Sequence, residues 1–479
     1  MCYTKSKDPF WRQLMKEYIY PSRVICENTG INTANLLKIQ PMQIGLAERF
    51  TTRFDDGDHV ILDFGKEMCG GVRILTFSSG MVKVRLRFGE SISETCAEIG
   101  GEKNATNDHA LRDFEINLPR FSDMSYGNTG FRFLRIDFFG RVDIKSIVAQ
   151  NNILDLEPIY RYNGTDARIS EIFETAKRTV DLCASCGYVW DGIKRDRLVW
   201  IGDMHPEMLA LTTLYGRMDE IERSLDFIKE QTPIGSWMNN MPMYSMWWII
   251  ILADYYEKTG FTEFITGQLD YLEALIEQTS GCVKESGELA YPSYFVDWPT
   301  HKQPDEIFGV RAINIIAMKK ASALLAHFGK DTSLAQSILE RLLKVDITPT
   351  HAKQVAGLKY FATDLTDADK KLLTNGCAKG MSTFMSYYIL KAVASFDKEL
   401  AIKMMKEYYG AMLDKGATTF FEDFDIEWAE NSCRIDEFPK EGERDIHGDF
   451  GAFCYVGYRH SLCHGWSAGV IQFIKEECE

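Results

Sequence analysis

The sequence contains no hydrophobic run long enough to cross a lipid bilayer. Its longest apolar stretch, residues 246–253, is much shorter than the ~20 residues that a membrane-spanning helix requires. Basic residues are also scarce, because 54 Lys and Arg stand against 69 Asp and Glu and give a net charge of −15. Nucleic acids and anionic membrane surfaces bind clustered positive charge. Neither is therefore an expected partner of this chain.

The sequence also lacks several features that mark cofactor, metal and disulfide sites. It has no glycine-rich phosphate loop and no zinc-binding helix with the pattern His-Glu-x-x-His. Twelve cysteines are scattered without the regular spacing of a disulfide framework. The one close pair, Cys183 and Cys186, has no second pair with which to bind zinc. We therefore expect reduced, buried thiols, no cofactor and no metal.

The first residues show no secretory signal. Residues 1–8 read Met-Cys-Tyr-Thr-Lys-Ser-Lys-Asp, and they contain neither the apolar segment nor the small-residue cleavage site that such a signal needs. The expected compartment is the cytoplasm, or the periplasm if a leader has been removed. The sequence does not predict the oligomeric state.

Two different periodicities divide the chain. Residues 1–155 alternate polar and apolar positions, for example at 82–88 and 131–136, with turn clusters and no amphipathic helix between them. This pattern predicts an antiparallel β-sandwich whose first 50 residues are poorly defined. From residue 156 to 479 the apolar period changes to 3.6, which indicates helices. A chain of 479 residues is also long enough for two domains.

The helical region has room for roughly a dozen helices, at about 27 residues for each helix with its loop. A dozen helices can close as six hairpins in a ring or stack as an open solenoid. No repeat of fixed period is visible, which favours the ring. The predicted fold is thus a multidomain, mainly α protein, with a β-sandwich at 1–155 followed by an (α/α)6 toroid at 156–479.

The densest cluster of charge lies directly before a predicted helix start. It comprises three acids, three cations and a tryptophan: Asp191, Lys194, Arg195, Asp196, Arg197, Trp200 and Asp203. Acids this close together are tolerated when they are solvated, paired with arginine or protonated. A protonated acid beside an aromatic ring is typical of glycoside hydrolysis. A solvated loop that caps the next helix with Asp203 explains the same spacing and stays an alternative.

A second carboxylate for such chemistry is Glu422. Hydrolysis of a glycosidic bond needs one acid that protonates the leaving oxygen and one carboxylate that activates water. Glu422 follows a small-residue segment and is flanked by aromatic residues, which raise the basicity of a carboxylate by excluding water. An ordinary acidic loop is the alternative, because Asp425, Glu427 and Glu430 follow closely.

Aromatic residues in the helical half are candidates for sugar binding, because sugar rings pack their C–H faces on flat side chains. Eight of the nine tryptophans lie beyond residue 189, and we expect half or more of them to be core residues. A lone histidine is also more often structural. The substrate-contacting residues that we predict in addition to the charged segment are Trp248, Asp297, Trp298, His464 and Trp466.

These segments resemble the bacterial α-L-rhamnosidases, six-hairpin glycosidases of the glycoside hydrolase family 78 type. Residues 191–203 resemble the family's Asp-Cys-Pro-x-Arg-Glu run, which ends in Trp-x-Gly-Asp. The segment Ala-Thr-Thr-Phe-Phe-Glu, ending at Glu422, resembles the family's Ala-Thr-Thr-x-Trp-Glu loop, and 462–466 is similar to its closing Leu-Asn-His segment. Residues 62–73 and 130–133 look like the preceding β domain, so the resemblance spans nearly the whole chain.

The resemblance implies a six-hairpin barrel and an inverting mechanism, with a water between two carboxylates roughly 6.5 to 9.5 Å apart. It implies Asp196 as the acid and Glu422 as the base, with Asp191 and Asp203 holding ring hydroxyls. Asp196 stands where the family usually has glutamate, so its carboxyl group reaches one methylene less. Glu207 is the alternative acid, although its place at a helix N-terminus favours the ionised form.

We therefore expect an exo-acting, inverting hydrolase of terminal α-L-rhamnosides or of a related sugar, acting on a short oligosaccharide or rhamnosylated glycoside. A second hypothesis is a barrel that binds carbohydrate without cleaving it, as a sensor or scavenger, because Asp196 departs from the family pattern. A third is another toroidal enzyme, a sugar epimerase or lyase, which needs a His or Tyr base rather than paired acids.

Overall fold

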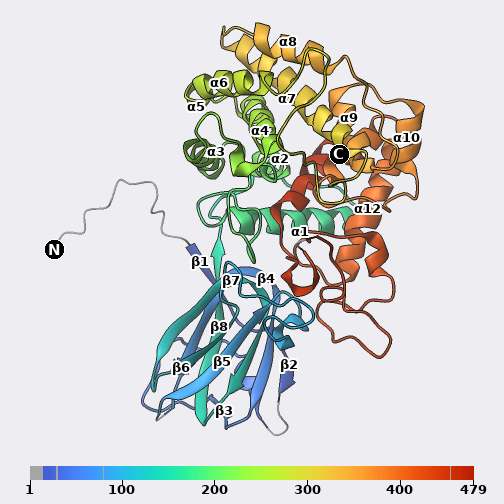
Figure 1. Ribbon diagram of the computed structural model, residues 1–479. Coiled ribbons are helices and arrows are strands. Elements are labelled where there is room, and N and C mark those ends of the chain that lie inside the picture. Colours follow the sequence, from blue (N-terminus) through green and yellow to red (C-terminus); the bar gives the residue numbers. More distant parts are fainter. Residues whose placement is uncertain (1–14, 28–30, 79, 454) are drawn as a thin grey trace, which may run out of the picture.

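The structure is a computed structural model that describes residues 15–27, 31–78, 80–453 and 455–479. A sheet domain and a helical domain lie end to end (Figure 1). Residues 1–8, in which we searched for a secretory signal, lie outside the described residues. Within the described residues, every helix is too short or too polar to span a membrane.

The sheet domain is built from eight antiparallel strands. They are β1 (Met15–Ile19), β2 (Arg23–Glu27), β3 (Thr52–Phe54), β4 (His59–Thr76), β5 (Val82–Gly89), β6 (Asp113–Leu118), β7 (Asp123–Phe138) and β8 (Val142–Ile153). The main path of hydrogen-bonded neighbours is β1-β8-β4-β7-β5-β6, with β2 also paired to β4 and β3 to β8. The apolar positions of the alternating pattern form one buried core inside this sheet.

Glycines let the central strand β4 bend. A Cβ atom at Gly70 would lie 2.0 Å from the carbonyl oxygen of Gln150, and one at Gly71 would lie 2.3 Å from that of Gly127. Only glycine fits where backbones approach this closely. The register of β4 shifts here, so its first half pairs with β2 and its second half with β8. The sheet thereby folds around its core.

The helical domain is a closed double ring. The inner helices are α2 (Met204–Tyr215), α4 (Pro242–Thr259), α7 (Glu306–His327), α9 (Lys353–Ala362), α11 (Ser386–Ala394) and α13 (Val470–Glu477). Each contacts the next, and α13 contacts both α11 and α2, which closes the ring. The outer helices are α1 (Ala167–Ala184), α3 (Asp219–Gln231), α6 (Leu269–Ser280), α8 (Ser333–Leu342), α10 (Asp367–Thr374) and α12 (Lys398–Asp414). A short α5 (Thr262–Thr266) precedes α6. The predicted β domain followed by a helical toroid is confirmed.

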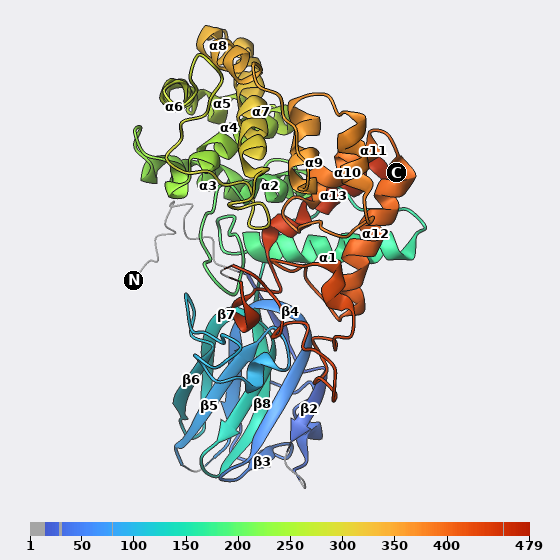
Figure 2. The ribbon, with the colours of Figure 1, turned by 45° about the vertical axis from the view of Figure 1, so that its right-hand side comes forward.

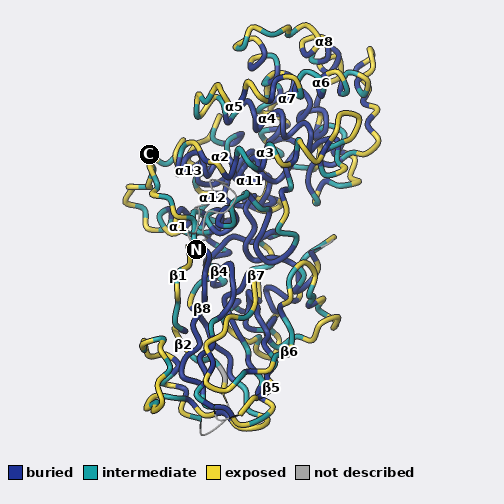
Figure 3. Tube along the Cα trace, turned by 90° about the vertical axis from the view of Figure 1, so that its left-hand side faces the viewer, coloured by how far each residue is buried: buried dark blue, intermediate teal, exposed yellow. Residues whose placement is uncertain are grey.

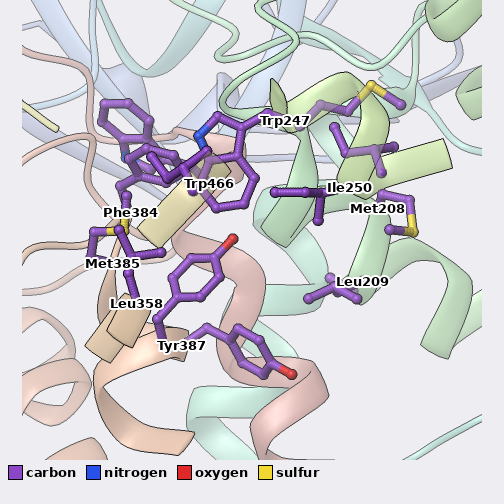
Figure 4. Close-up of a cluster of buried hydrophobic side chains, with 14 of the residues drawn as sticks. Met208, Leu209, Trp247, Ile250, Leu358, Phe384, Met385, Tyr387 and Trp466 are labelled. Carbon is purple, nitrogen blue, oxygen red and sulfur yellow. The ribbon is translucent and has the colours of Figure 1, made fainter. Parts of the chain in front are cut away.

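Hydrophobicity explains which helices form the inner ring. Every residue of α2 is buried, whereas α3 buries only one stripe. A helix that is apolar all round is stable only inside a protein. Figure 3 shows the buried trace running through the middle of both domains. Figure 4 shows side chains such as Met208, Trp247, Leu358 and Trp466 in one cluster of buried hydrophobic residues between the inner helices.

The loops before the inner helices α2 and α13 lie against the sheet domain. Gly130 of β7 packs directly on Ile193, because a Cβ atom at this glycine would lie 2.8 Å from the isoleucine side chain. The Ser461 hydroxyl donates to Glu90 Oε1 at 3.1 Å. Figure 2 shows the last, red part of the chain beside the ends of β7 and β4. The boundary predicted at 155/156 falls between β8 and α1.

Candidate active site

Three segments that are far apart in the sequence meet where the barrel faces the sheet domain. They are residues 191–203 before α2, 417–424 after α12 and 460–466 before α13. The amide of Gly465 donates to the carbonyl of Asp191 at 2.7 Å, and that of Glu422 donates to the carbonyl of Ser461 at 2.9 Å. Backbone hydrogen bonds therefore fix the three segments against one another.

Arg195 joins the two carboxyl groups that the sequence singles out. Its Nη1 donates to Asp196 Oδ2 at 2.9 Å, and its Nη2 donates to Glu422 Oε1 at 2.6 Å. The side chain of Asp196 is 18% exposed, whereas that of Glu422 is 2% exposed. One guanidinium group thus separates a carboxyl group at the rim of the site from one in its interior.

Burial changes the acidity of Glu422. Its Oε2 accepts from the amide of Ser461 at 2.9 Å, and His464 Nε2 lies 3.5 Å from its Oε1. Burial raises the pKa of Glu422 to about 7, although Arg195 and the Ser461 amide oppose the rise. Its carboxylate is therefore a stronger base than an exposed one, and it still ionises near neutral pH.

Two further acids and a histidine face one another beside Glu422. His464 Nε2 lies 3.9 Å from Asp191 Oδ2 and 4.0 Å from Asp203 Oδ2. Tyr244 donates to Asp203 Oδ1 at 2.7 Å. Burial raises the pKa of Asp203 to about 8 and that of Asp191 well above its usual value. Burial also lowers the pKa of His464. Protonated acids and a neutral imidazole offer the mixed donors and acceptors that sugar hydroxyls bind.

Two trios of described side chains bring possible metal ligands together, namely Asp191, Asp203 and His464, and Glu90, Glu94 and His447. In the first trio, burial raises the pKa of both acids, so a metal ion binding there would compete with protons for their carboxyl groups. In the second, Lys194 Nζ lies 2.8 Å from Glu94 and 3.3 Å from Glu90. The Arg112 guanidinium also donates to Glu94, so basic side chains already contact the acids of that trio.

Two of the predicted tryptophans border the acidic cluster. The Trp466 ring packs against the His464 ring, with 4.1 Å between centroids, and its Nε1 donates to the carbonyl of Glu422 at 2.9 Å. Trp200 packs edge-on against Tyr244, the residue that donates to Asp203. Its Nε1 is buried without a hydrogen-bond partner among the described residues. Both indoles therefore form walls of the candidate site.

Trp298 reaches the cluster through Tyr455. Its Nε1 donates to the Tyr455 hydroxyl at 2.5 Å, and the Tyr455 ring lies 5.1 Å from the Arg195 guanidinium. Its neighbour Asp297 is occupied differently, because its Oδ1 accepts from Thr300 and its Oδ2 accepts from the Ser382 hydroxyl at 2.8 Å. Asp297 therefore holds the turn before α7, and its contacts give it no role at the carboxylates.

Trp248 lies outside the cluster. It is fully buried in the barrel wall, packs against Tyr271 and donates to the carbonyl of Leu225. The sequence placed it among the substrate contacts because it is a tryptophan in the helical half. Helix α4 is buried on most of its surface, so this position is part of the hydrophobic core, and we exclude Trp248 from the candidate site.

Glu207, the alternative acid, is also buried. A Cβ atom on the facing Gly465 would lie 1.7 Å from its Oε1, and no hydrogen bond to this oxygen is found among the described residues. Burial, together with the nearby Asp203 and Asp191, raises the pKa of Glu207 well above its usual value. Desolvation thus outweighs the helix N-terminus, which was expected to favour the ionised form.

Residues 465–469 read Gly-Trp-Ser-Ala-Gly and match the Gly-x-Ser-x-Gly motif of the nucleophile elbow in serine hydrolases. Ser467 is fully buried and donates to the carbonyl of Phe421 at 2.6 Å. It lies in a 3₁₀ turn rather than between a strand and a helix. The geometry therefore does not support a nucleophilic serine.

Sequence reasoning missed residues that complete the cluster. Tyr244 and Tyr455 hold Asp203 and Arg195, and nothing in the sequence distinguishes them from the other tyrosines. His109 Nε2 lies 3.1 Å from Asp196 Oδ1, although His109 belongs to the sheet domain. A single histidine in a polar loop carries no periodic or motif signal, so only the packing of the two domains reveals it.

A separate cavity of about 330 Å³ lies on the barrel axis toward the C-terminal ends of the inner helices. Its lining includes His205, Asp254, Lys320 and Tyr388. His205 Nε2 lies 2.9 Å from Asp254 Oδ2. None of the residues in the cluster around Arg195 lines this cavity, so the two ends of the barrel hold separate groups of charged side chains.

Comparison with known proteins identifies the fold. No family model and no curated protein matches the sequence. The structure is similar to a rhamnosidase from Klebsiella oxytoca with rhamnose bound, with a TM-score of 0.76 and 19% identity over 97% of this chain and 96% of that chain.

It is also similar to a GH78 family rhamnosidase of Bacillus sp. GL1, with a TM-score of 0.69 and 18% identity over 92% of this chain. The α-L-rhamnosidase from Dictyoglomus thermophilum gives a TM-score of 0.68 and 14% identity over 96% of this chain. The chain spans 48% and 51% of the length of these two structures. The chain therefore has the fold of the α-L-rhamnosidases, a β domain followed by an (α/α)6 barrel.

Proposed function

We propose that the protein is a glycoside hydrolase that releases terminal α-L-rhamnose, or a closely related sugar, with inversion at the anomeric carbon. The observation that carries this proposal is the contact of one guanidinium, that of Arg195, with both Asp196 and Glu422. Arg195 and Glu422 are 227 positions apart in the sequence. Two acids delivered to one point from separate segments are what hydrolysis of a glycosidic bond requires.

Glu422 is the proposed base. Its buried position and its pKa of about 7 suit a carboxylate that removes a proton from water near neutral pH. The Ser461 amide and Arg195 hold its two oxygens in fixed directions. An attacking water between Glu422 and the sugar is thereby oriented before the reaction begins.

Asp196 is the proposed acid. It lies at the more exposed side of the cluster, where a leaving group can depart into solvent. Asp196 and Arg197 have φ values of 59° and 55°, so the loop turns sharply where this shorter acid stands. In the reaction, Asp196 protonates the glycosidic oxygen as the bond to the anomeric carbon breaks.

The remaining groups bind the sugar ring. Asp191, Asp203 and His464 offer mixed donors and acceptors to hydroxyls, and the rings of Trp466 and Tyr455 present flat faces. Exposure falls steeply from Asp196 to Glu422, and this gradient supports the proposal that the terminal sugar of a glycoside binds on the Glu422 side. The rhamnose bound in the Klebsiella oxytoca structure supports the choice of sugar.

The test is a panel of p-nitrophenyl glycosides with NMR of the first product. We expect the α-L-rhamnoside to be the best substrate and the β-anomer of rhamnose to appear first. A retained anomer contradicts the inverting mechanism. Saccharide binding in calorimetry without turnover supports the carbohydrate-binding alternative, and Asp196→Glu then tests whether the shorter acid is the cause. A product other than the hydrolysed sugar points to an epimerase or lyase.

A further inference from the structure

His109 brings the sheet domain into contact with the proposed acid. Its Nε2 lies 3.1 Å from Asp196 Oδ1, while Arg195 donates to the other oxygen, Oδ2, at 2.9 Å. The carboxyl group is therefore held between one residue of its own loop and one from the other domain. If Asp196 only formed a structural ion pair with Arg195, it would not need the additional contact with His109.

Both loops adopt costly backbone conformations to make the contact. His109 has a φ of 65° and Asp196 a φ of 59°, values in the left-handed region that non-glycine residues rarely adopt. The Asn107 carboxamide oxygen accepts from two backbone amides of its loop, and Arg197 donates to the carbonyl of Asn128 on β7. Strained residues that surrounding contacts hold in place are typical of functional positions.

The exposed fraction of the side chain decreases from His109 to Asp196 to Glu422. The side chain of His109 is 35% exposed and that of Asp196 is 18% exposed, whereas Glu422 behind Arg195 is 2% exposed. Solvent therefore reaches His109 first. Imidazole is also the side chain that takes up and releases protons near neutral pH.

We propose that His109 is the proton relay of the candidate active site, returning a proton to Asp196 in each turnover. This inference rests on the proposed function, in which Asp196 gives its proton to the glycosidic oxygen while the leaving group keeps the electron pair of the broken C–O bond. The Asp196 carboxylate then takes the proton on Nε2 of the His109 imidazolium. The neutral imidazole regains a proton from solvent, and Glu422 releases to solvent the proton that it took from the attacking water, so all three residues return to their starting state.

The surroundings contain other groups whose charge acts on this pair. They are Arg195, Arg197, Asp191, Asp203 and Glu422 near Asp196, and Asp108, paired with Arg459, next to His109. Asp203 and Glu422 also titrate near neutral pH, but both are buried and do not contact His109. A variant at His109 leaves them in place, so its effect is separable from theirs.

The test uses the full chain carrying His109→Gly. Glycine accepts a positive φ without strain, so this variant keeps the loop conformation and leaves space for added imidazole. Turnover is compared on methyl α-L-rhamnoside, whose leaving group needs protonation, and on the 2,4-dinitrophenyl glycoside, whose leaving group does not. We expect about a tenfold or larger loss of kcat on the first and a change within about twofold on the second.

Two further readouts sharpen the test. The alkaline limb of the kcat profile for the methyl glycoside should move to lower pH in His109→Gly, because only solvent then returns the proton to Asp196, and the proton supply from solvent falls as pH rises. Added imidazole should restore part of the lost turnover. The matched control is His327→Gln, at the C-terminal end of α7, which should leave all three readouts unchanged.

The outcomes separate the relay from the proposed function. Equal losses on both glycosides, an unmoved pH limb or the absence of imidazole rescue overturns the relay. His109→Gln, whose side chain cannot relay a proton, must lose turnover on the methyl glycoside as His109→Gly does. Wild-type turnover in this variant also overturns the relay. If the wild-type protein hydrolyses no glycoside, the proposed function fails instead.

Discussion

The pKa values of buried acids shift in opposite directions at the two ends of the barrel. At the end that faces the sheet domain, burial raises the pKa of Asp203 to about 8 and that of Glu422 to about 7. At the other end, Asp254 is buried as well, yet its pKa lies below the usual value, because His205 and Lys320 bond to it and outweigh desolvation. The difference lies in the direct partners, because Asp254 contacts both Lys320 and His205, whereas Asp203 is bonded by the neutral Tyr244 hydroxyl.

This contrast separates groups that stabilise the fold from groups that are kept for chemistry. A buried carboxylate with partners on both oxygens contributes to a structural network. A buried carboxyl group that holds a proton at neutral pH costs stability, and proteins keep such groups mainly where a reaction or a ligand needs them. Asp203, in the cluster around Arg195, belongs to the second kind, and Asp254 belongs to the first.

The largest expected effect comes from removing the proposed base. Glu422→Gln keeps the shape of the side chain and its contact with Ser461, but it cannot accept a proton. We expect kcat to fall by about a thousandfold, or about 4 kcal/mol in activation free energy. Steady-state assays on p-nitrophenyl α-L-rhamnoside measure it. The matched control is Glu427→Gln, an exposed position that should retain full activity. Wild-type turnover in Glu422→Gln removes this residue from the mechanism.

The opposite end of the barrel should respond in stability rather than in rate. Asp254→Asn leaves Lys320 and His205 without their anionic partner, and we expect the free energy of unfolding to fall by about 3 kcal/mol. The kcat of the folded protein should stay within about twofold of the wild-type value. Urea denaturation measures the free energy of unfolding. Steady-state assays at a known concentration of folded protein measure kcat. A large loss of kcat with unchanged stability in Asp254→Asn would show that Asp254 serves the reaction rather than the fold.

The pH dependence of stability tests the raised pKa of Asp203. Its pKa is about 8 when folded and about 4 when unfolded, so between these values the folded protein keeps a proton that the unfolded chain has lost. The free energy of unfolding therefore falls as pH rises through this window. Asp203→Asn has no such proton. Its unfolding free energy relative to wild type should increase by about 2 kcal/mol from pH 5 to pH 7, measured by urea denaturation.

A difference that does not change with pH contradicts the assignment for Asp203. Asp254 gives the reverse control, because its pKa is lowered in the folded state. Its contribution to stability is present above about pH 4, the unfolded value, and is lost as pH falls further. The contribution to stability should therefore fall with rising pH for Asp203 and rise with rising pH for Asp254.

The smallest effect distinguishes a tryptophan at the site from one in the core. Trp298→Ala removes a ring that hydrogen-bonds to Tyr455, and we expect KM to rise about fivefold, or about 1 kcal/mol, with little change in kcat. Trp248→Phe should lower the free energy of unfolding by a similar amount and leave KM unchanged. Substrate titrations and urea denaturation measure the pair. A KM effect only in Trp248→Phe refutes this division.

Much of the architecture was predictable from the sequence, because period two and period 3.6 report directly which faces are buried. The motif segments ending at Asp203 and Glu422 were also visible, and the structure brings them to one guanidinium. The role of each tryptophan was not visible. Trp248 and Trp466 are both indoles in the helical half, and only their positions, one in the barrel wall and one beside His464, tell them apart.

The sequence did not predict side-chain ionisation and contacts correctly where these depend on burial. Glu207 at a helix N-terminus was expected to favour its ionised form, but its pKa is raised because the surrounding segments exclude water. His109 gave no signal, because its contact with Asp196 arises from the packing of two domains. Asp297 was assigned to the substrate, whereas Thr300 and Ser382 occupy its carboxylate.

The amino-acid sequence by itself determined the order of a β domain and a ring of helices, since hydrophobic periodicity is a local property of the chain. It also determined which acids are available. Only the tertiary structure decided which acids keep a proton, which aromatic rings reach the carboxylates and that the sheet domain contributes a histidine. Desolvation and charge coupling depend on distances between segments that are remote in sequence, and those distances exist only after the chain has folded.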